Sequence, residues 1–122
     1  MSLHGSISFE WADGTHIFRL AHGQIRELQE KSNAGIIQIF TRIKDGAWYL
    51  DDLREVIRLG LIGGGKTPLD ALALTVRYVD ERPLLESVAP ATAILMAALV
   101  GSPDDPVGKK KQKCPRGKQT DG

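Results

Sequence analysis

The stretch Asp51–Leu72, DDLREVIRLGLIGGGKTPLDAL, decides the fold of this 122-residue chain. Its first part has apolar residues at the 3.6-residue spacing of an amphipathic helix, which predicts an α-helix over residues 51–62. Three glycines at 63–65 then predict a helix stop. Thr67 supplies an N-cap hydroxyl and Pro68 a first helical residue, so we expect a second helix to begin there. The predicted inward residues of the first helix are Leu53, Val56, Ile57 and Leu61, and the predicted outward ones are Asp52, Glu55 and Arg58.

The same glycines belong to a phosphate-binding pattern. Residues 60–67 fit G-x-x-x-x-G-K-[ST] letter for letter, with Lys66 at the lysine position. That pattern binds nucleotides when a buried strand delivers the loop, and when another strand ends in an aspartate that holds magnesium. Here the preceding segment has helical periodicity and Gly60 falls inside it. We interpret the glycines as a helix stop, and a P-loop-like nucleotide-binding protein remains a competing interpretation.

The N-terminal segment predicts a β-hairpin. Asp13-Gly14 is a dipeptide preferred in two-residue type I′ turns, and apolar residues alternate on both sides of it. An isolated hairpin is only marginally stable in water, so its apolar face is expected to pack on the helices. A turn at this dipeptide would place three pairs on that face, namely Trp11–His16, Phe9–Phe18 and Ile7–Leu20.

Further helices are predicted on both sides of the central pair. The last of them should be kinked or divided in two at Pro90, because proline removes a backbone donor inside a helix. Together these elements predict an α+β fold in which an N-terminal β-hairpin packs on a small bundle of four to five α-helices. The additional helical segments are 21–32, from Ile36 to the Asp45-Gly46 break, from Thr67 to about Asp80, and 84–100.

The chain is expected to form one domain, residues 5–101, with a flexible start at 1–4. Residues 102–122 carry six Lys or Arg, three Asp and almost no apolar side chains, whereas residues 1–101 carry ten Lys or Arg and twelve Asp or Glu. A segment with so little apolar surface cannot offset the entropy of ordering. We therefore predict a disordered basic tail on a slightly acidic body.

The basic tail raises the possibility of nucleic-acid binding. Its lysine-rich run, residues 109–113, has no aromatic residues between the cations, so binding there would be non-specific and sensitive to salt. A solubilising tail is an equal interpretation. We expect no specific nucleic-acid partner, and a small DNA-binding regulator is a second competing interpretation.

No group of residues has the composition and spacing of a catalytic or metal site. The chain has three histidines, in different predicted elements, and one cysteine: His4, His16, His22 and Cys114. Their spacing matches no known set of metal ligands. Asp51–Asp52 lies at a helix start, where carboxylates interact favourably with the helix dipole. We predict a protein that is not an enzyme and that takes no cofactor and no metal.

Cysteine usage and hydropathy indicate the compartment. A single cysteine cannot form an internal disulfide, which fits a reducing environment. No segment approaches the roughly 18 uninterrupted apolar residues of a membrane span, and the N-terminus lacks the pattern of a secretory signal. We expect a cytoplasmic protein without a membrane partner.

Surface side chains that could bind a protein partner fall in two segments. Trp48 and Tyr49 precede the helix at 51–62; they serve either as buried staples of the helix entry or as exposed anchors. The aliphatic residues of the segment 83–100 could belong to the core or line a groove for a partner helix. The candidate partner-binding residues are Trp48, Tyr49, Leu84, Leu85, Val88 and Leu95.

The order of these features resembles the tail-assembly chaperones of gene transfer agents and phages, a family also labelled phage tail tube proteins. The resemblance spans residues 5–101 and leaves out the basic tail. It rests on Arg26-Glu27-Leu28, on Gly46–Leu53, on the glycine-rich Gly60–Gly65, and on Val88–Ala91 followed by Ile94–Leu99.

The resemblance implies a role in tail morphogenesis. Such chaperones bind the long helical tape-measure protein and keep it soluble until tail-tube subunits polymerise around it, and they have no active site. We therefore expect a non-enzymatic chaperone in the host cytoplasm, with a tape-measure or other tail protein as partner and with homo-oligomerisation as an open question. The alternative within the same class is a structural component that stays in the particle.

Overall fold

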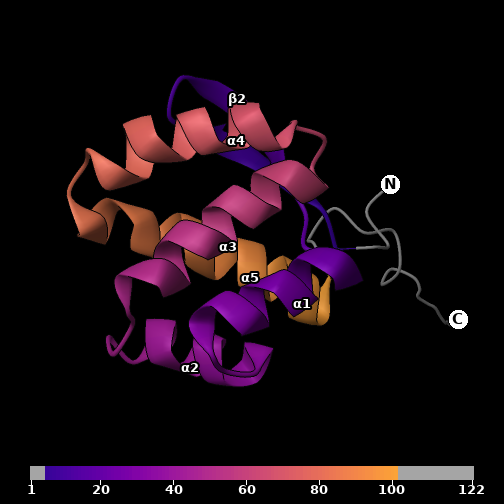
Figure 1. Cartoon of the computed structure of the whole chain (residues 1–122), viewed down its shortest axis with the longest axis vertical. Helices are drawn as coiled ribbons and strands as arrows, with labels where there is room; N and C mark the ends of the chain where they lie inside the picture. Colours follow the sequence, from indigo (N-terminus) through magenta and orange to yellow (C-terminus); the bar gives the residue numbers. More distant parts are fainter. Residues whose placement is uncertain (1–4, 102–122) are drawn as a thin grey trace, which may run out of the picture.

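The computed structural model describes residues 5–101, in which a β-hairpin is followed by helices (Figure 1). The predicted flexible start and basic tail, with His4 and Cys114, lie outside the described residues. The strands are β1 (Ile7–Trp11) and β2 (Gly14–Phe18), and the helices are α1 (His22–Ser32), α2 (Ile36–Lys44), α3 (Leu50–Gly63), α4 (Pro68–Thr75) with the π-helical turn η1 (Val76–Asp80), the 3₁₀ turn η2 (Leu84–Ser87) and α5 (Val88–Val100).

Helix α3 lies at the centre of the fold and contacts the hairpin and the other α-helices (Figure 1). All four of its predicted inward residues are fully buried, and Phe18 of β2 joins them in the core. The predicted start of α4 is also confirmed, since the Asp70 backbone amide donates to Thr67 Oγ1 at 3.1 Å. The α+β architecture of a hairpin packed on five α-helices is therefore the one that the sequence predicts.

The hairpin forms, but its predicted register is wrong by two residues. Ile7 pairs with Phe18 and Phe9 with His16, so the turn residues are Ala12 and Asp13. A shift of two keeps every side chain on its predicted face, because strands alternate with a period of two. The predicted ring contacts survive as diagonal neighbours, with the Phe9 and Phe18 centroids 4.6 Å apart and those of Trp11 and His16 5.6 Å apart.

The turn has an unusual backbone at Ala12, whose φ is +61°. A positive φ at the first central position alone matches a type II′ turn, in which glycine is preferred, and not the predicted type I′ turn. Asp13 compensates with its side chain, because its Oδ1 lies 2.8 Å from His16 Nε2. This contact joins the turn to β2 in the observed register.

Replacing Ala12 with glycine is expected to stabilise the domain by about 1 kcal/mol, because the left-handed conformation is strained when a Cβ is present. A thermal melt followed by circular dichroism should show a rise of about 4–8 °C for a domain of this size. The same change at Ala73, in α4, should lower stability by about 1 kcal/mol. A lower melting temperature for Ala12→Gly would contradict the proposed strain.

Glycines at the end of α3 allow the hairpin backbone to approach the helix directly. A Cβ at Gly63 would lie 1.9 Å from the Arg19 carbonyl oxygen, and one at Gly64 would lie 2.0 Å from that of Ile17. The Arg19 amide also donates to the Gly60 carbonyl at 2.9 Å. The glycine-rich stretch therefore serves helix–strand packing as well as helix termination.

Two residues predicted to face outward from α3 are buried instead. Asp52 is fully buried, and its Oδ1 accepts from Arg42 Nη2 at 3.0 Å. The Asp52 Oδ2 accepts from the backbone amide of Tyr49 at 2.8 Å, and Arg42 Nη2 also donates to the carbonyl of Ser32 at 3.1 Å. The prediction fails because neighbouring helices cover the polar side of α3 too. The Arg42–Asp52 ion pair, together with the bond from Arg42 to the Ser32 carbonyl, links the end of α1 to α2 and to the start of α3.

Glu55 is the second buried carboxylate, and Arg58, also predicted outward, is mostly buried beside it. Both Arg54 and Arg58 donate to Glu55, Arg58 also reaches Glu27 of α1 at 3.1 Å, and Arg54 reaches Asp80 of η1 at 3.0 Å. These hydrogen bonds raise the pKa of both arginines, chiefly through Asp80 for Arg54 and through Glu55 for Arg58. Alternating charges thus connect α1, α3 and η1.

The break in the last helical segment lies before Pro90, not at it. The chain forms the 3₁₀ turn η2 and then α5, which places Pro90 in the first turn of α5. A proline in the first turn removes an amide that would have no helical acceptor in any case, so it requires no kink. The predicted kink within α5 is therefore replaced by a change of helix type at Ser87–Val88.

Candidate partner-binding site

The structure separates the two aromatic candidates that precede α3. Trp48 is half-buried and packs against the core, as a staple of the helix entry would. Tyr49 is 65% exposed, and the Arg42 guanidinium lies over its ring at 4.8 Å from the centroid. Only Tyr49 of this pair therefore presents most of its side chain at the surface.

The candidates of the 83–100 segment also divide by burial. Leu85 is 77% exposed and Leu84 is 38% exposed, both on η2. Val88 is half-buried against the core, and Leu95 is fully buried within it. Leu95 therefore belongs to the core in this fold.

Exposed aliphatic residues that sequence reasoning did not select lie on α4 and η1. They are Leu69, Leu72 and Val76, and Leu69 is 76% exposed. Their spacing of three and four residues places them along one side of the helix. Helical periodicity alone could not reveal them, since the same residues at the same spacing equally predict a buried stripe. We call the exposed aliphatic side chains of α4 to η2 the aliphatic segment: Leu69, Leu72, Val76, Leu84 and Leu85.

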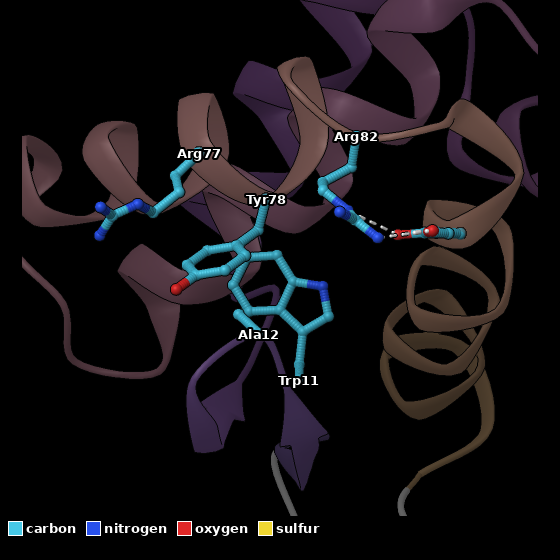
Figure 2. Close-up of a pocket in the computed structure, with 6 residues that line it drawn as sticks. Trp11, Ala12, Arg77, Tyr78 and Arg82 are labelled. Carbon is cyan, nitrogen blue, oxygen red and sulfur yellow. Dashed lines mark hydrogen bonds and ion pairs between the residues drawn. The ribbon is translucent and has the colours of Figure 1, made fainter.

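A cleft of about 430 Å³ lies between the hairpin turn, η1 and η2 (Figure 2). Figure 2 shows the rings of Trp11 and Tyr78 next to each other at its centre, and their centroids are 5.8 Å apart in an edge-on arrangement. Both rings are half-buried. We call this feature the aromatic–arginine cleft, and its lining residues are Trp11, Ala12, Arg77, Tyr78, Arg82 and Glu86.

The two arginines of the cleft differ in their ion pairing. Arg82 forms a two-point ion pair with Glu86, at 3.1 and 3.0 Å, which raises the pKa of Arg82. The guanidinium carbon of Arg77 lies 6.0 Å from the centroid of the Tyr78 ring. Among residues 5–101, no carboxylate lies within ion-pairing distance of Arg77. The cleft thus offers an aromatic surface and one cation, Arg77, that no carboxylate of residues 5–101 neutralises.

The segment that fits the phosphate-binding pattern is built differently from a nucleotide site. Gly60 and Gly63 belong to α3, and the Gly63 and Gly64 backbone lies against the hairpin. Gly64, Gly65 and Lys66 line a hollow of about 220 Å³ together with residues 15–17 of β2. The element that precedes the loop is a helix, whereas the phosphate-binding arrangement requires a strand there.

Between residues 5 and 101, no three His, Cys, Asp or Glu side chains are grouped so that they could hold a metal ion. Within the same residues, no helix has the length and hydropathy needed to cross a membrane.

The fold and the cleft define a small α+β protein whose surface combines exposed aliphatic, aromatic and arginine side chains. Residues 4–101 match the model of a protein family described as phage tail tube protein, GTA-gp10. Since this match covers well over half of the chain, the protein belongs to that family. It is therefore a tail-associated protein of a phage or gene transfer agent, and the resemblance inferred from the sequence is confirmed. No curated protein and no solved structure gave a significant match.

Proposed function

We propose that this protein is a non-enzymatic tail-assembly chaperone that binds a helical segment of the tape-measure protein in the host cytoplasm. Membership in a tail-associated family supports a tail protein as partner. The tape-measure protein is the tail component that most needs such a partner, because it is a long helical chain that must stay soluble until the tube forms around it.

The observation that carries the proposal is the aliphatic segment. Five large aliphatic side chains are exposed within residues 68–87, and Leu69 and Leu85 each leave about three quarters of their area in solvent. Burying one such side chain fully contributes about 1.5–3 kcal/mol, so contact with several of them would hold an amphipathic helix. Contiguous exposed apolar patches mark protein-binding surfaces, and Leu69, Leu72 and Val76 lie along one side of one helix.

Co-expression with overlapping fragments of the tape-measure protein tests the proposal. We expect at least one fragment to be recovered as a soluble complex, and the variant Leu69→Ser/Leu85→Ser to bind it at least about tenfold more weakly. Because both leucine side chains are exposed, the melting temperature of this double variant should stay near that of the wild type.

A matched control removes two aliphatic side chains of similar exposure elsewhere on the surface. Ile37 is 61% exposed on α2, and Val100 is 71% exposed at the end of α5. The variant Ile37→Ser/Val100→Ser should bind the fragment as the wild type does. The proposal is wrong if no fragment forms a complex, or if the two double variants bind equally well.

A second candidate function is a structural component of the tail. The family description, which names a tail tube protein, favours this role. Mass spectrometry of purified particles separates the two functions, because a chaperone is released before the particle is complete. Detection of this chain in stoichiometric amounts would favour the structural role.

A further inference from the structure

We propose that the aromatic–arginine cleft is a second contact site for a protein partner, and that it takes an acidic side chain flanked by aliphatic residues in an extended or helical segment. This inference rests on the proposed function, because it specifies the chemistry of the segment that the protein partner presents. The cleft lies between the hairpin and η1 (Figure 2), and its lining includes none of the residues of the aliphatic segment.

The apolar part of the ligand is indicated by the two rings. Trp11 and Tyr78 are half-buried and meet edge-on, so each ring keeps part of its surface in the cleft. Tryptophan, tyrosine and arginine are the residue types most enriched among side chains that dominate protein–protein binding. A leucine or isoleucine side chain would cover the exposed ring surfaces and displace water from them.

The acidic part of the ligand is indicated by the charges. Arg82 is already paired with Glu86, whereas Arg77 lacks a carboxylate partner among residues 5–101. Figure 2 shows Arg77 on the side of Tyr78 away from Arg82, with its guanidinium directed away from the two rings. A carboxylate arriving there can accept two parallel hydrogen bonds from the guanidinium, which is the strongest geometry available to such a pair.

Local backbone geometry supports a binding role for the same cleft. Ala12, at one wall, has a positive φ, and Tyr78 is held by the π-helical turn η1. Both features are unfavourable in isolation, and both types of irregularity are concentrated at functional sites. Both irregularities therefore lie in the lining of the same cleft.

The charge of the surroundings favours a peptide over a nucleic acid. Residues 1–101 carry twelve acidic and ten basic side chains, and Glu86 itself lines the cleft. A polyanion gains little here, because Arg82 is already paired with Glu86 and only Arg77 lacks a carboxylate partner among residues 5–101. A single acidic residue in an otherwise neutral, aliphatic segment matches this arrangement.

The test uses Trp11 as an internal reporter. The full chain has two tryptophans, so the variant Trp48→Phe leaves Trp11 as the only one. The probe is a short acetylated and amidated synthetic peptide with Leu-Glu-Leu at its centre, titrated while the emission of Trp11 is recorded. If Trp48→Phe does not fold, the indole N–H signals of the wild-type chain in two-dimensional NMR provide the same readout.

We expect a saturable change in the Trp11 signal with this peptide. A peptide with Leu-Gln-Leu, or the variant Arg77→Gln, should weaken binding by about tenfold or more, because each removes one partner of the charge-assisted pair. Arg26 is an exposed arginine on α1, an element that contributes no residue to the lining of the cleft, and Arg26→Gln serves as the matched control. It should bind the Leu-Glu-Leu peptide as the wild type does.

Three results would overturn the inference: no saturable change, equal binding of the two peptides, or a stronger response to a single-stranded oligonucleotide than to the acidic peptide. The assay needs no tape-measure protein, so its failure leaves the proposed chaperone function to stand on the aliphatic segment alone. Conversely, if the peptide binds but no tape-measure fragment forms a complex, the cleft remains a peptide-binding site and the tape-measure protein is rejected as the partner.

Discussion

Replacing Gly63 with alanine is expected to remove most of the stability of the domain, by roughly 3–5 kcal/mol. The added methyl carbon would lie 1.9 Å from the Arg19 carbonyl oxygen and 2.9 Å from its carbon. Both obstructing atoms belong to the backbone, so no side-chain rotation can relieve the clash. The hairpin would have to separate from α3, which would expose Phe18, a fully buried side chain.

Urea denaturation followed by circular dichroism measures this effect, and two other glycines supply the comparison. Gly23 in α1 has open space where a Cβ would lie, so Gly23→Ala should be neutral or stabilising by about 0.5–1 kcal/mol. A Cβ at Gly60 would meet Ile94 and Phe18 at 3.2 and 3.4 Å, and these side chains can shift slightly. Gly60→Ala should therefore fall between the two. A Gly63→Ala protein as stable as Gly60→Ala would refute this account of the glycine contacts.

The sequence predicted the elements well because each depends on local chemistry. The helical period of Leu53, Val56 and Ile57, and the hydroxyl of Thr67, belong to segments of only a few residues. The hairpin register failed for the opposite reason. Asp13-Gly14 fits a type I′ turn locally, but the side-chain contact of Asp13 with His16 and the packing of β2 against α3 select a different turn.

The candidate site was less predictable, because exposure is a property of the assembled fold. Leu84 and Leu85 were identified from the sequence and are exposed, whereas Leu95, from the same segment, is in the core. No local signal distinguishes these leucines. The aromatic–arginine cleft was missed because Trp11 and Tyr78 are far apart in the sequence, and only the docking of η1 on the hairpin brings their rings together.

The burial of Asp52 was also missed, and it has consequences for stability. A carboxylate in the first turn of a helix commonly faces solvent and interacts with the helix dipole. Here the start of α3 is covered by α1 and α2, so the carboxylate needs a buried partner, which Arg42 provides at 3.0 Å. The sequence shows that residue 52 is acidic, but it does not show which residue pairs with it, because Arg42 comes from another helix.

Replacing Asp52 with alanine is expected to destabilise the domain by about 3 kcal/mol. The change leaves the Arg42 guanidinium, whose side chain is only 16% exposed, without a carboxylate, and it leaves the Tyr49 amide without its acceptor. Such a buried charge without a partner costs several kcal/mol, although the partial exposure of Arg42 moderates the loss. Urea denaturation provides the measurement, at neutral pH and moderate salt.

The adjacent Asp51 is the matched control, because it is exposed in the same helical turn. Asp51→Ala removes only the interaction with the helix dipole and should cost about 0.3–1 kcal/mol. The double variant Arg42→Leu/Asp52→Leu removes both charges and should be more stable than Asp52→Ala, since no buried ion then lacks a partner. If Asp52→Ala costs no more than Asp51→Ala, the pair with Arg42 contributes little. A double variant less stable than Asp52→Ala would instead show that the unpaired Arg42 guanidinium is not the source of the lost stability.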